Sequence, residues 1–225
     1  MSRVAREVQA ILAGAVQWLV THRWRLAVTL AVAFGFTAVL LPRDAALLAA
    51  IQDSGVGSEE LARFVTSLGR FENSTLAFAM IAAVVAMLAN SVRWRDIAVA
   101  CLLAGIVGGI TVNVLRPTLG RARPHAVVAP GFYWFEITDD FNSMPSGHAM
   151  SNAASAFAIV ALVPAAIVPA TAYVVAMSWT RLRLNRHYPS DVMWGSLLGA
   201  IVGLAVGSSI RDRRRRAVST VPGRS

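Results

Sequence analysis

Three short segments of the chain contain the residue types that bind and transfer phosphate. Residues 116–124 read Arg-Pro-Thr-Leu-Gly-Arg-Ala-Arg-Pro, residues 145–148 read Pro-Ser-Gly-His, and residues 180–191 add further arginines, a histidine and an aspartate. Arginine binds phosphate oxygens through a planar fork of N–H donors. Histidine acts as a nucleophile or as a general acid and base. The combination therefore indicates chemistry on a phosphate group.

The second segment places a histidine in the first turn of an expected helix. Ser146 is a favourable N-cap residue, and Gly147 lets the backbone approach a ligand closely. Helix N-termini attract anions through their free N–H groups and the positive end of the helix dipole. We therefore expect Ser146, Gly147 and His148 to contact a bound phosphate. Taken alone, the segment is equally well an ordinary helix start with an incidental histidine.

The third segment begins another expected helix, with Pro189 suited to its first position. His187 and Asp191 are four residues apart, so we expect the Asp191 carboxylate to accept the Nδ1–H of His187. That bond would fix the tautomer and leave Nε2 free to attack a substrate. Taken alone, the segment is equally well a capped helix whose histidine faces lipid headgroups.

Three arginines at predicted helix ends, Arg116, Arg123 and Arg181, are candidates for binding the phosphate oxygens. A single arginine at a membrane edge is more often an anchor that reaches into the headgroups. These three, however, lie beside both histidine segments on the side of the membrane where arginine is expected to be scarce. Their clustering therefore favours a phosphate site.

The loop after Arg123 offers weaker candidates. His125 follows the first segment directly, and loop residues often line active sites, so it is a possible substrate contact. The same loop contains three acidic residues, Glu136, Asp139 and Asp140. We interpret them as a solvated acidic stretch, because no histidine stands at a spacing typical of metal ligands. No metal and no cofactor is predicted.

Composition places these segments in a membrane protein. Of 225 residues, 56% are hydrophobic and 15% are charged, which excludes an ordinary water-soluble globule. The fold class expected is all-α: a polytopic membrane helix bundle with six transmembrane helices and an N-terminal interfacial amphipathic helix. The six helices are expected at about 24–41, 74–90, 96–115, 148–163, 165–180 and 191–210.

The chain is expected to form one domain. Residues 1–23 form the interfacial helix, 24–210 the six-helix core, and 211–225 a basic, disordered tail. A cleaved signal peptide is the rival interpretation of the N-terminus, but glutamines interrupt its apolar part and a longer apolar run follows. Four glycines spaced four apart in the last helix predict close packing inside the bundle rather than a dimer interface: Gly195, Gly199, Gly203 and Gly207.

Charge distribution predicts the orientation in the membrane. The net charge is +9, and all 21 basic residues are arginines. They lie between apolar runs and in the tail, which fits membrane orientation better than nucleic-acid binding. The positive-inside rule puts both termini in the cytoplasm and the three segments outside. Pro164 and Pro169 divide the apolar stretch 148–180 into two helices, which keeps His148 and His187 on one side.

Together, the three segments resemble the signature of the type 2 phosphatidic acid phosphatase and haloperoxidase superfamily, in its integral-membrane lipid phosphatase branch. That signature is Lys-x6-Arg-Pro, Pro-Ser-Gly-His and Ser-Arg-x5-His-x3-Asp. Arg116 replaces the usual lysine, and Thr180 replaces the usual serine. The resemblance implies a metal-independent reaction in which His187 attacks phosphorus and forms a phosphohistidine. His148 then serves as general acid and base, and the arginines, Ser146 and the Gly147 amide stabilise the phosphoryl oxygens.

The resulting expectation is hydrolysis of a lipid phosphate or diphosphate monoester on the external face of a bacterial inner membrane. Undecaprenyl diphosphate, phosphatidic acid, phosphatidylglycerol phosphate and a lipid A phosphate all remain open as substrates. One alternative is a lipid phosphotransferase that uses the same phosphohistidine. A second is a non-enzymatic lipid-binding protein or transporter, which the lack of ionisable residues in the middle of the predicted spans disfavours.

Overall fold

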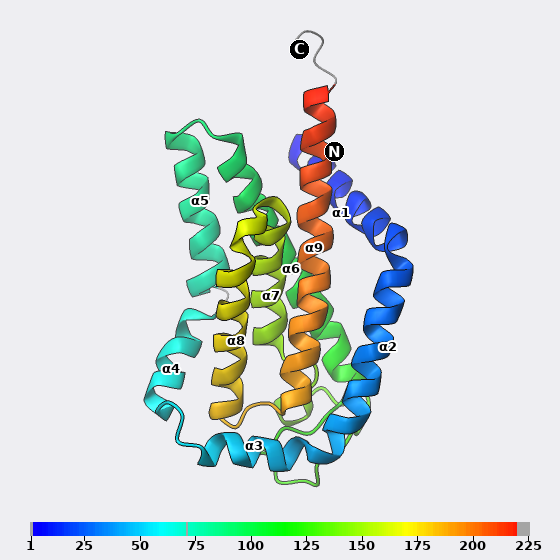
Figure 1. The fold of residues 1–225 in the computed structure, drawn as a ribbon, viewed down its shortest axis with the longest axis vertical. Coiled ribbons are helices and arrows are strands. Elements are labelled where there is room, and N and C mark those ends of the chain that lie inside the picture. Colours follow the sequence, from blue (N-terminus) through cyan, green and yellow to red (C-terminus); the bar gives the residue numbers. More distant parts are fainter. Residues whose placement is uncertain (1, 71, 220–225) are drawn as a thin grey trace.

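The computed structural model describes residues 2–70 and 72–219, and these residues form an all-helical bundle. The helices are α1 (Arg3–Thr21), α2 (Arg23–Leu40), α3 (Asp44–Asp53), α4 (Glu59–Leu68), α5 (Ala77–Leu88), α6 (Val92–Leu119), α7 (Gly147–Leu162), α8 (Ile167–Arg183) and α9 (Pro189–Ser219). Most run along the long axis of the molecule, whereas α3 lies across one end (Figure 1). The predicted all-α fold is confirmed.

All six predicted core helices are present, as α2 and α5 to α9. By length and composition, three described helical stretches could cross a membrane: Arg23–Asp53, Val92–Leu119 and Pro189–Ser219. A fourth is reached if the bent pair Glu59–Leu68 and Asn73–Leu88 counts as one span. The helix α7 is apolar but shorter.

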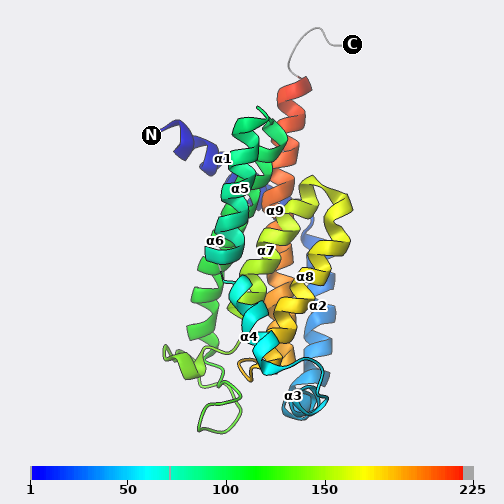
Figure 2. The same ribbon diagram turned by 90° about the vertical axis from the view of Figure 1, so that its left-hand side faces the viewer.

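The predicted break between α7 and α8 is also found. A short 3-10 turn, Pro164–Ala166, separates the two helices, because proline cannot donate the backbone hydrogen bond that would continue the helix. The two helices then run side by side in opposite directions (Figures 1 and 2). The start of α7 and the end of α8 therefore meet at one end of the bundle, together with α3, α4 and the long loop before α7.

The glycine stripe of α9 packs against α7, as predicted. A Cβ atom on Gly195 would lie 2.5 Å from the carbonyl oxygen of Ser146, and one on Gly199 would lie 2.3 Å from that of Met150. Only glycine permits this backbone approach. It brings the N-termini of α7 and α9 together, and the Ser146 N–H donates to the Asp191 carbonyl oxygen over 3.0 Å.

The other end of the bundle holds both termini (Figure 1). The predicted disordered tail after residue 210 is wrong for residues 211–219, because α9 continues to Ser219. Arg211 stabilises this extension by donating from Nη1 to the Ala161 carbonyl oxygen over 3.1 Å. Residues 220–225 lie outside the described part of the chain. The amphipathic α1 packs its buried Ile11 and Ala15 against Ala205, Val206 and Ile210 of α9, just before the extension.

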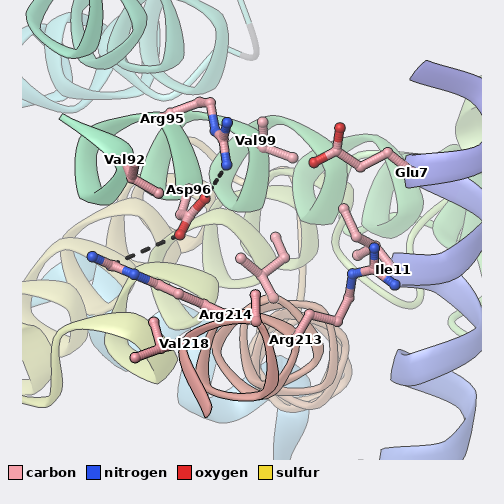
Figure 3. A pocket seen from close by; sticks show the side chains of 11 residues that line it. Glu7, Ile11, Val92, Arg95, Asp96, Val99, Arg213, Arg214 and Val218 are labelled. Atoms are coloured by element: carbon pink, nitrogen blue, oxygen red, sulfur yellow. Dashed lines mark hydrogen bonds and ion pairs between the residues drawn. The ribbon is translucent and has the colours of Figure 1, made fainter. Parts of the chain in front are cut away.

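A cavity of about 700 Å³ lies between α1, α6 and α9 at this end. Figure 3 shows Arg95 and Arg214 turned toward Asp96, at N–O distances of 3.5 Å and 3.8 Å. None of its lining residues belongs to the three phosphate-binding segments. The candidate chemistry is therefore at the opposite end of the molecule.

Candidate active site

The structure brings the three predicted segments together at the end of the bundle covered by α3 and α4. Arg116, near the end of α6, donates from Nε to the Pro145 carbonyl oxygen over 3.0 Å. Its guanidinium lies against Gly147, where a Cβ atom would come within 2.8 Å of Nη2. Glycine at this position therefore lets the Arg116 side chain reach the first turn of α7.

The other two predicted arginines, Arg123 and Arg181, lie near Arg116. The charges of Arg116 and Arg123 both act on Arg181, which comes from the last turn of α8. Arg123 is 8% exposed and donates from Nη2 to Asp139 over 2.9 Å, while Arg181 donates from Nη1 to Thr66 over 3.0 Å. Three like charges held this close repel each other, and a bound anion would relieve the repulsion. Burial lowers the pKa of Arg123.

Unused donors mark the place for such an anion. Among the residues that the structure describes, Arg123 Nε, Arg181 Nε and Ser146 Oγ are buried without a hydrogen-bond partner. Each buried unpaired polar group costs roughly 1–3 kcal/mol. A phosphoryl group would accept hydrogen bonds from donors of this kind. These donors fit an oxyanion.

His187 is buried at 1% exposure, and its orientation differs from the prediction. Its Nδ1 atom lies 2.8 Å from the Ser143 carbonyl oxygen and 3.7 Å from the nearest Asp191 oxygen. Because a carbonyl can only accept, Nδ1 carries the proton and Nε2 is left with its lone pair. Burial lowers the pKa of His187 to about 4, although the charge of Asp191 opposes the shift. The ring is therefore neutral at pH 7.

The Asp191 carboxylate accepts its hydrogen bonds from groups other than His187. Its carboxylate accepts hydrogen bonds from Ser143 Oγ over 2.5 Å, from the Tyr188 N–H over 2.8 Å and from Arg121 Nη1 over 2.5 Å. The predicted direct bond from the imidazole is replaced by Ser143, whose carbonyl faces the ring and whose hydroxyl faces the carboxylate.

His148 lines a cavity of about 220 Å³ with Arg116 and Gly147. The charges of Arg181, His187 and Arg116 act on the His148 ring, so the two histidines are close enough to interact. The shared catalytic role of the two histidines stays a prediction.

A larger, mostly apolar groove of about 570 Å³ lies between α5, α7 and α8. It shares Thr75 and Asn152 with the smaller cavity that contains His148. Asn152 donates to the His148 carbonyl oxygen over 2.8 Å and accepts from Tyr173 over 2.5 Å. The apolar groove and the polar cavity are therefore neighbours, with this asparagine lining both.

His125 contacts neighbouring loop residues, and its contact with the substrate stays a prediction. Its ring is exposed, with Nδ1 at 3.2 Å from the Asn185 carbonyl oxygen and Nε2 at 3.8 Å from Asp140. The sequence reasoning missed Arg121 and Ser143, which bind Asp191, and Asp44, which binds Arg121. The only available signal was the position of Arg121 in the first segment, two residues before Arg123.

Comparison with known proteins agrees with this arrangement. Residues 96–215, which contain all three segments, match the model of the PAP2 superfamily. This chain belongs to the PAP2 superfamily. This PAP2 protein also has the fold of a transmembrane PAP2-type phosphatidylglycerolphosphate phosphatase from Bacillus subtilis. The TM-score is 0.58 at 19% identity, covering 86% of this chain and 98% of that one.

Named relatives of this PAP2 protein are phosphatases. A lipid A 1-phosphatase from Rhizobium johnstonii is 36% identical over 107 residues, which are 43% of this chain and 44% of the relative. This chain therefore matches less than half of that relative's length. A decaprenylphosphoryl-5-phosphoribose phosphatase from Mycobacterium tuberculosis is 31% identical over 179 residues, which are 77% of this chain and 94% of the relative.

Proposed function

We propose that this protein is a lipid phosphatase that hydrolyses a lipid phosphate or diphosphate monoester through a phosphohistidine on His187. The observation that carries the proposal is the set of buried donors without partners on Arg123, Arg181 and Ser146, in the same cluster as a neutral histidine. The donors would bind the negatively charged phosphoryl oxygens, and the histidine would act as the nucleophile.

In the first step, Nε2 of His187 attacks phosphorus in line with the bond to the lipid oxygen. The N–P bond forms as the P–O bond breaks, and His148, which takes up a proton when the anionic phosphate binds beside it, gives that proton to the leaving oxygen. Arg116, Arg123 and Arg181, with Ser146 Oγ and the Gly147 amide, stabilise the three equatorial oxygens.

In the second step, the now neutral His148 takes a proton from water, and the oxygen attacks phosphorus. The N–P bond breaks, inorganic phosphate leaves, and His187 is neutral again with its proton on Nδ1. The hydrogen bond from Nδ1 to the Ser143 carbonyl keeps the ring in place through both steps.

The apolar groove supports a lipid as the substrate. A headgroup at His148 would place an acyl or prenyl chain toward Thr75 and Asn152 and into the groove of about 570 Å³. The relatives' names support lipid A 1-phosphate, already a candidate substrate, and add a polyprenylphosphoryl pentose phosphate to the panel. Phosphatidic acid, phosphatidylglycerol phosphate and undecaprenyl diphosphate complete it.

The orientation proposed is a multi-pass protein of the bacterial inner membrane, with both termini in the cytoplasm and the site on the external face. The arginine-rich extension of α9 and the start of α1 lie at the end opposite to the site (Figure 1). The positive-inside rule assigns that end to the cytoplasm.

Phosphate release by the purified protein across this lipid panel tests the proposed activity. Wild type is expected to release phosphate without added divalent metal, and His187→Ala is expected to release none. His22→Ala, which removes a histidine between α1 and α2 at the other end of the bundle, is the matched control and is expected to retain activity. Full activity in His187→Ala would refute the nucleophile. Transfer of phosphate to an added alcohol in preference to water would show a phosphotransferase instead.

A further inference from the structure

Arg121 joins two buried carboxylates next to the proposed nucleophile. Its side chain is 5% exposed. Nη1 donates to Asp191 over 2.5 Å and to Ser190 Oγ over 2.6 Å, and Nη2 donates to Asp44 over 2.7 Å. The guanidinium also stacks on the ring of Tyr188, with Cζ 4.6 Å from the ring centroid. This one side chain therefore contacts α3, α9 and the loop that carries His187.

Asp44 reaches this site from a distant part of the sequence. It lies in the first turn of α3 and is 2% exposed. Besides Arg121, it accepts from the Ser190 N–H over 3.0 Å and from the Ser190 hydroxyl. The helix α3 lies across the end of the bundle, which brings Asp44 to the N-terminus of α9 (Figures 1 and 2).

We propose that Arg121 is a positioning residue for His187, which acts by binding the Asp191 carboxylate beside the imidazole and offsetting its charge. The inference rests on the proposed role of His187 as nucleophile. Nη1 of Arg121 binds Asp191 Oδ1. The other carboxylate oxygen, Oδ2, accepts from Ser143 Oγ and the Tyr188 N–H and lies 3.7 Å from His187 Nδ1, which donates to the Ser143 carbonyl.

Electrostatics explains why this arrangement matters. The ionisable groups that act on His187 are Asp191 from α9, Arg116 from α6, Arg181 from α8 and His148 from α7. Asp191 is the only anion among these four, and it favours the protonated imidazolium, which cannot attack phosphorus. A guanidinium bound to Asp191 offsets that charge. Without Arg121, the charge of Asp191 beside the ring would be left without its compensating cation and would stabilise the protonated form of the ring.

Arg121 itself remains charged in this position. Burial alone would lower its pKa, but the charges of Asp191 and Asp44 and the hydrogen bonds to both raise it above the ordinary value. Asp44 thus supplies the second anion that keeps the guanidinium in place between the carboxylates. Arg121, Asp191 and Asp44 together therefore carry one positive and two negative charges.

Substitution of Arg183 is the matched control for a purely structural role of Arg121. Arg183 also ties the 42–73 segment to the bundle, donating from Nε to the Gly57 carbonyl oxygen over 3.0 Å and from Nη1 to that of Gln52 over 3.2 Å. It has no hydrogen bond to Asp191 or His187 among those of the described residues. Loss of Arg183 should loosen α3 and α4 without changing the charge balance at His187.

The deciding measurement is the pKa of His187 in detergent-solubilised protein, followed by NMR of isotope-labelled histidine and assigned with His187→Ala. Wild type is expected near 4. Arg121→Gln is expected to raise this pKa by roughly one pH unit or more, because an uncompensated anion favours the charged ring. Arg183→Gln and Asp44→Asn are expected to leave it unraised, since neither frees the Asp191 charge.

Turnover and folding are measured in the same samples. Arg121→Lys retains the charge but not the planar fork, so it should fold, keep the His187 pKa near the wild-type value and lose at least about tenfold in phosphate release. An unchanged His187 pKa in a folded Arg121→Gln, or an equal rise in Arg183→Gln, would overturn the inference. Wild-type protein that released no phosphate would instead overturn the proposed function, whatever the NMR result.

Discussion

His187 is oriented by the backbone of Ser143 rather than by a side chain: Nδ1 lies 2.8 Å from the Ser143 carbonyl oxygen. The hydroxyl of the same residue binds Asp191 over 2.5 Å. One residue therefore fixes the tautomer of the proposed nucleophile and holds the neighbouring carboxylate. Mutation of the side chain removes only the second of these contacts.

Ser143→Ala is accordingly expected to reduce phosphate release by no more than about tenfold, because the carbonyl that holds Nδ1 remains and one neutral hydrogen bond is worth about 1 kcal/mol. Asp191→Ala should be far more harmful, since it leaves the buried Arg121 without one of its two carboxylates. Steady-state phosphate release by both variants shows which of the two substitutions costs more activity. A larger loss in Ser143→Ala than in Asp191→Ala would contradict the assigned contacts.

Stability should depend on pH through His187. Its pKa is about 4 in the folded protein, compared with an ordinary value of about 6.5. The unfolded chain therefore binds more protons between these values, and folded stability falls as the pH drops from about 6.5 to about 4, by up to about 3 kcal/mol. Thermal melting across this window should show a steeper loss for wild type than for His187→Gln. Parallel curves would contradict the low pKa.

Close packing of α9 on α7 should be required for the site as a whole. Gly199→Ala places a Cβ atom 2.3 Å from the Met150 carbonyl oxygen, so the helices must separate. We expect a lower melting temperature and a loss of phosphate release. Gly35→Ala on α2 is the control, because a Cβ there meets nothing within 4 Å. Equal melting temperatures for the two variants would exclude this role for the glycine stripe.

The helices and most of the site could be predicted from the sequence because their signals are local. Apolar runs separated by arginines set the helices, Pro164 marked the turn after α7, and the short segments around His148 and His187 named the candidate chemistry. The contacts of Asp191 could not be predicted in this way. Asp44 is an isolated carboxylate in a different part of the chain, and the partner of His187 Nδ1 is a backbone carbonyl, which carries no residue-type signal.

The end of α9 is a second feature that could not be predicted from the sequence. A run of arginines after residue 210 is typical of a solvated tail, yet Arg211 and Arg214 contact Ala161 and Asp96 and keep the segment helical. Such stabilisation comes from groups on other helices. Hydropathy along the sequence does not report it.

The proposed orientation can be tested with single cysteines in a Cys101→Ala background. Val127 is fully exposed in the loop at the site end, and Val218 is exposed on α9 at the other end. We expect a membrane-impermeant maleimide to label Val127→Cys in intact cells and Val218→Cys only after permeabilisation of the inner membrane. The reverse pattern would place the site in the cytoplasm.

The most direct test of the account is to trap the phosphoenzyme. With a 32P-labelled phosphate ester whose good leaving group needs no general acid, acid-labile and alkali-stable label should appear on His187. It should accumulate in His148→Ala, because His148 is proposed to activate the water that removes it. Label on His187 that builds up in His148→Ala and is absent from His187→Ala is the result predicted. Rapid phosphate release by wild type, with no label on His187 in either wild type or His148→Ala, would contradict the central claim.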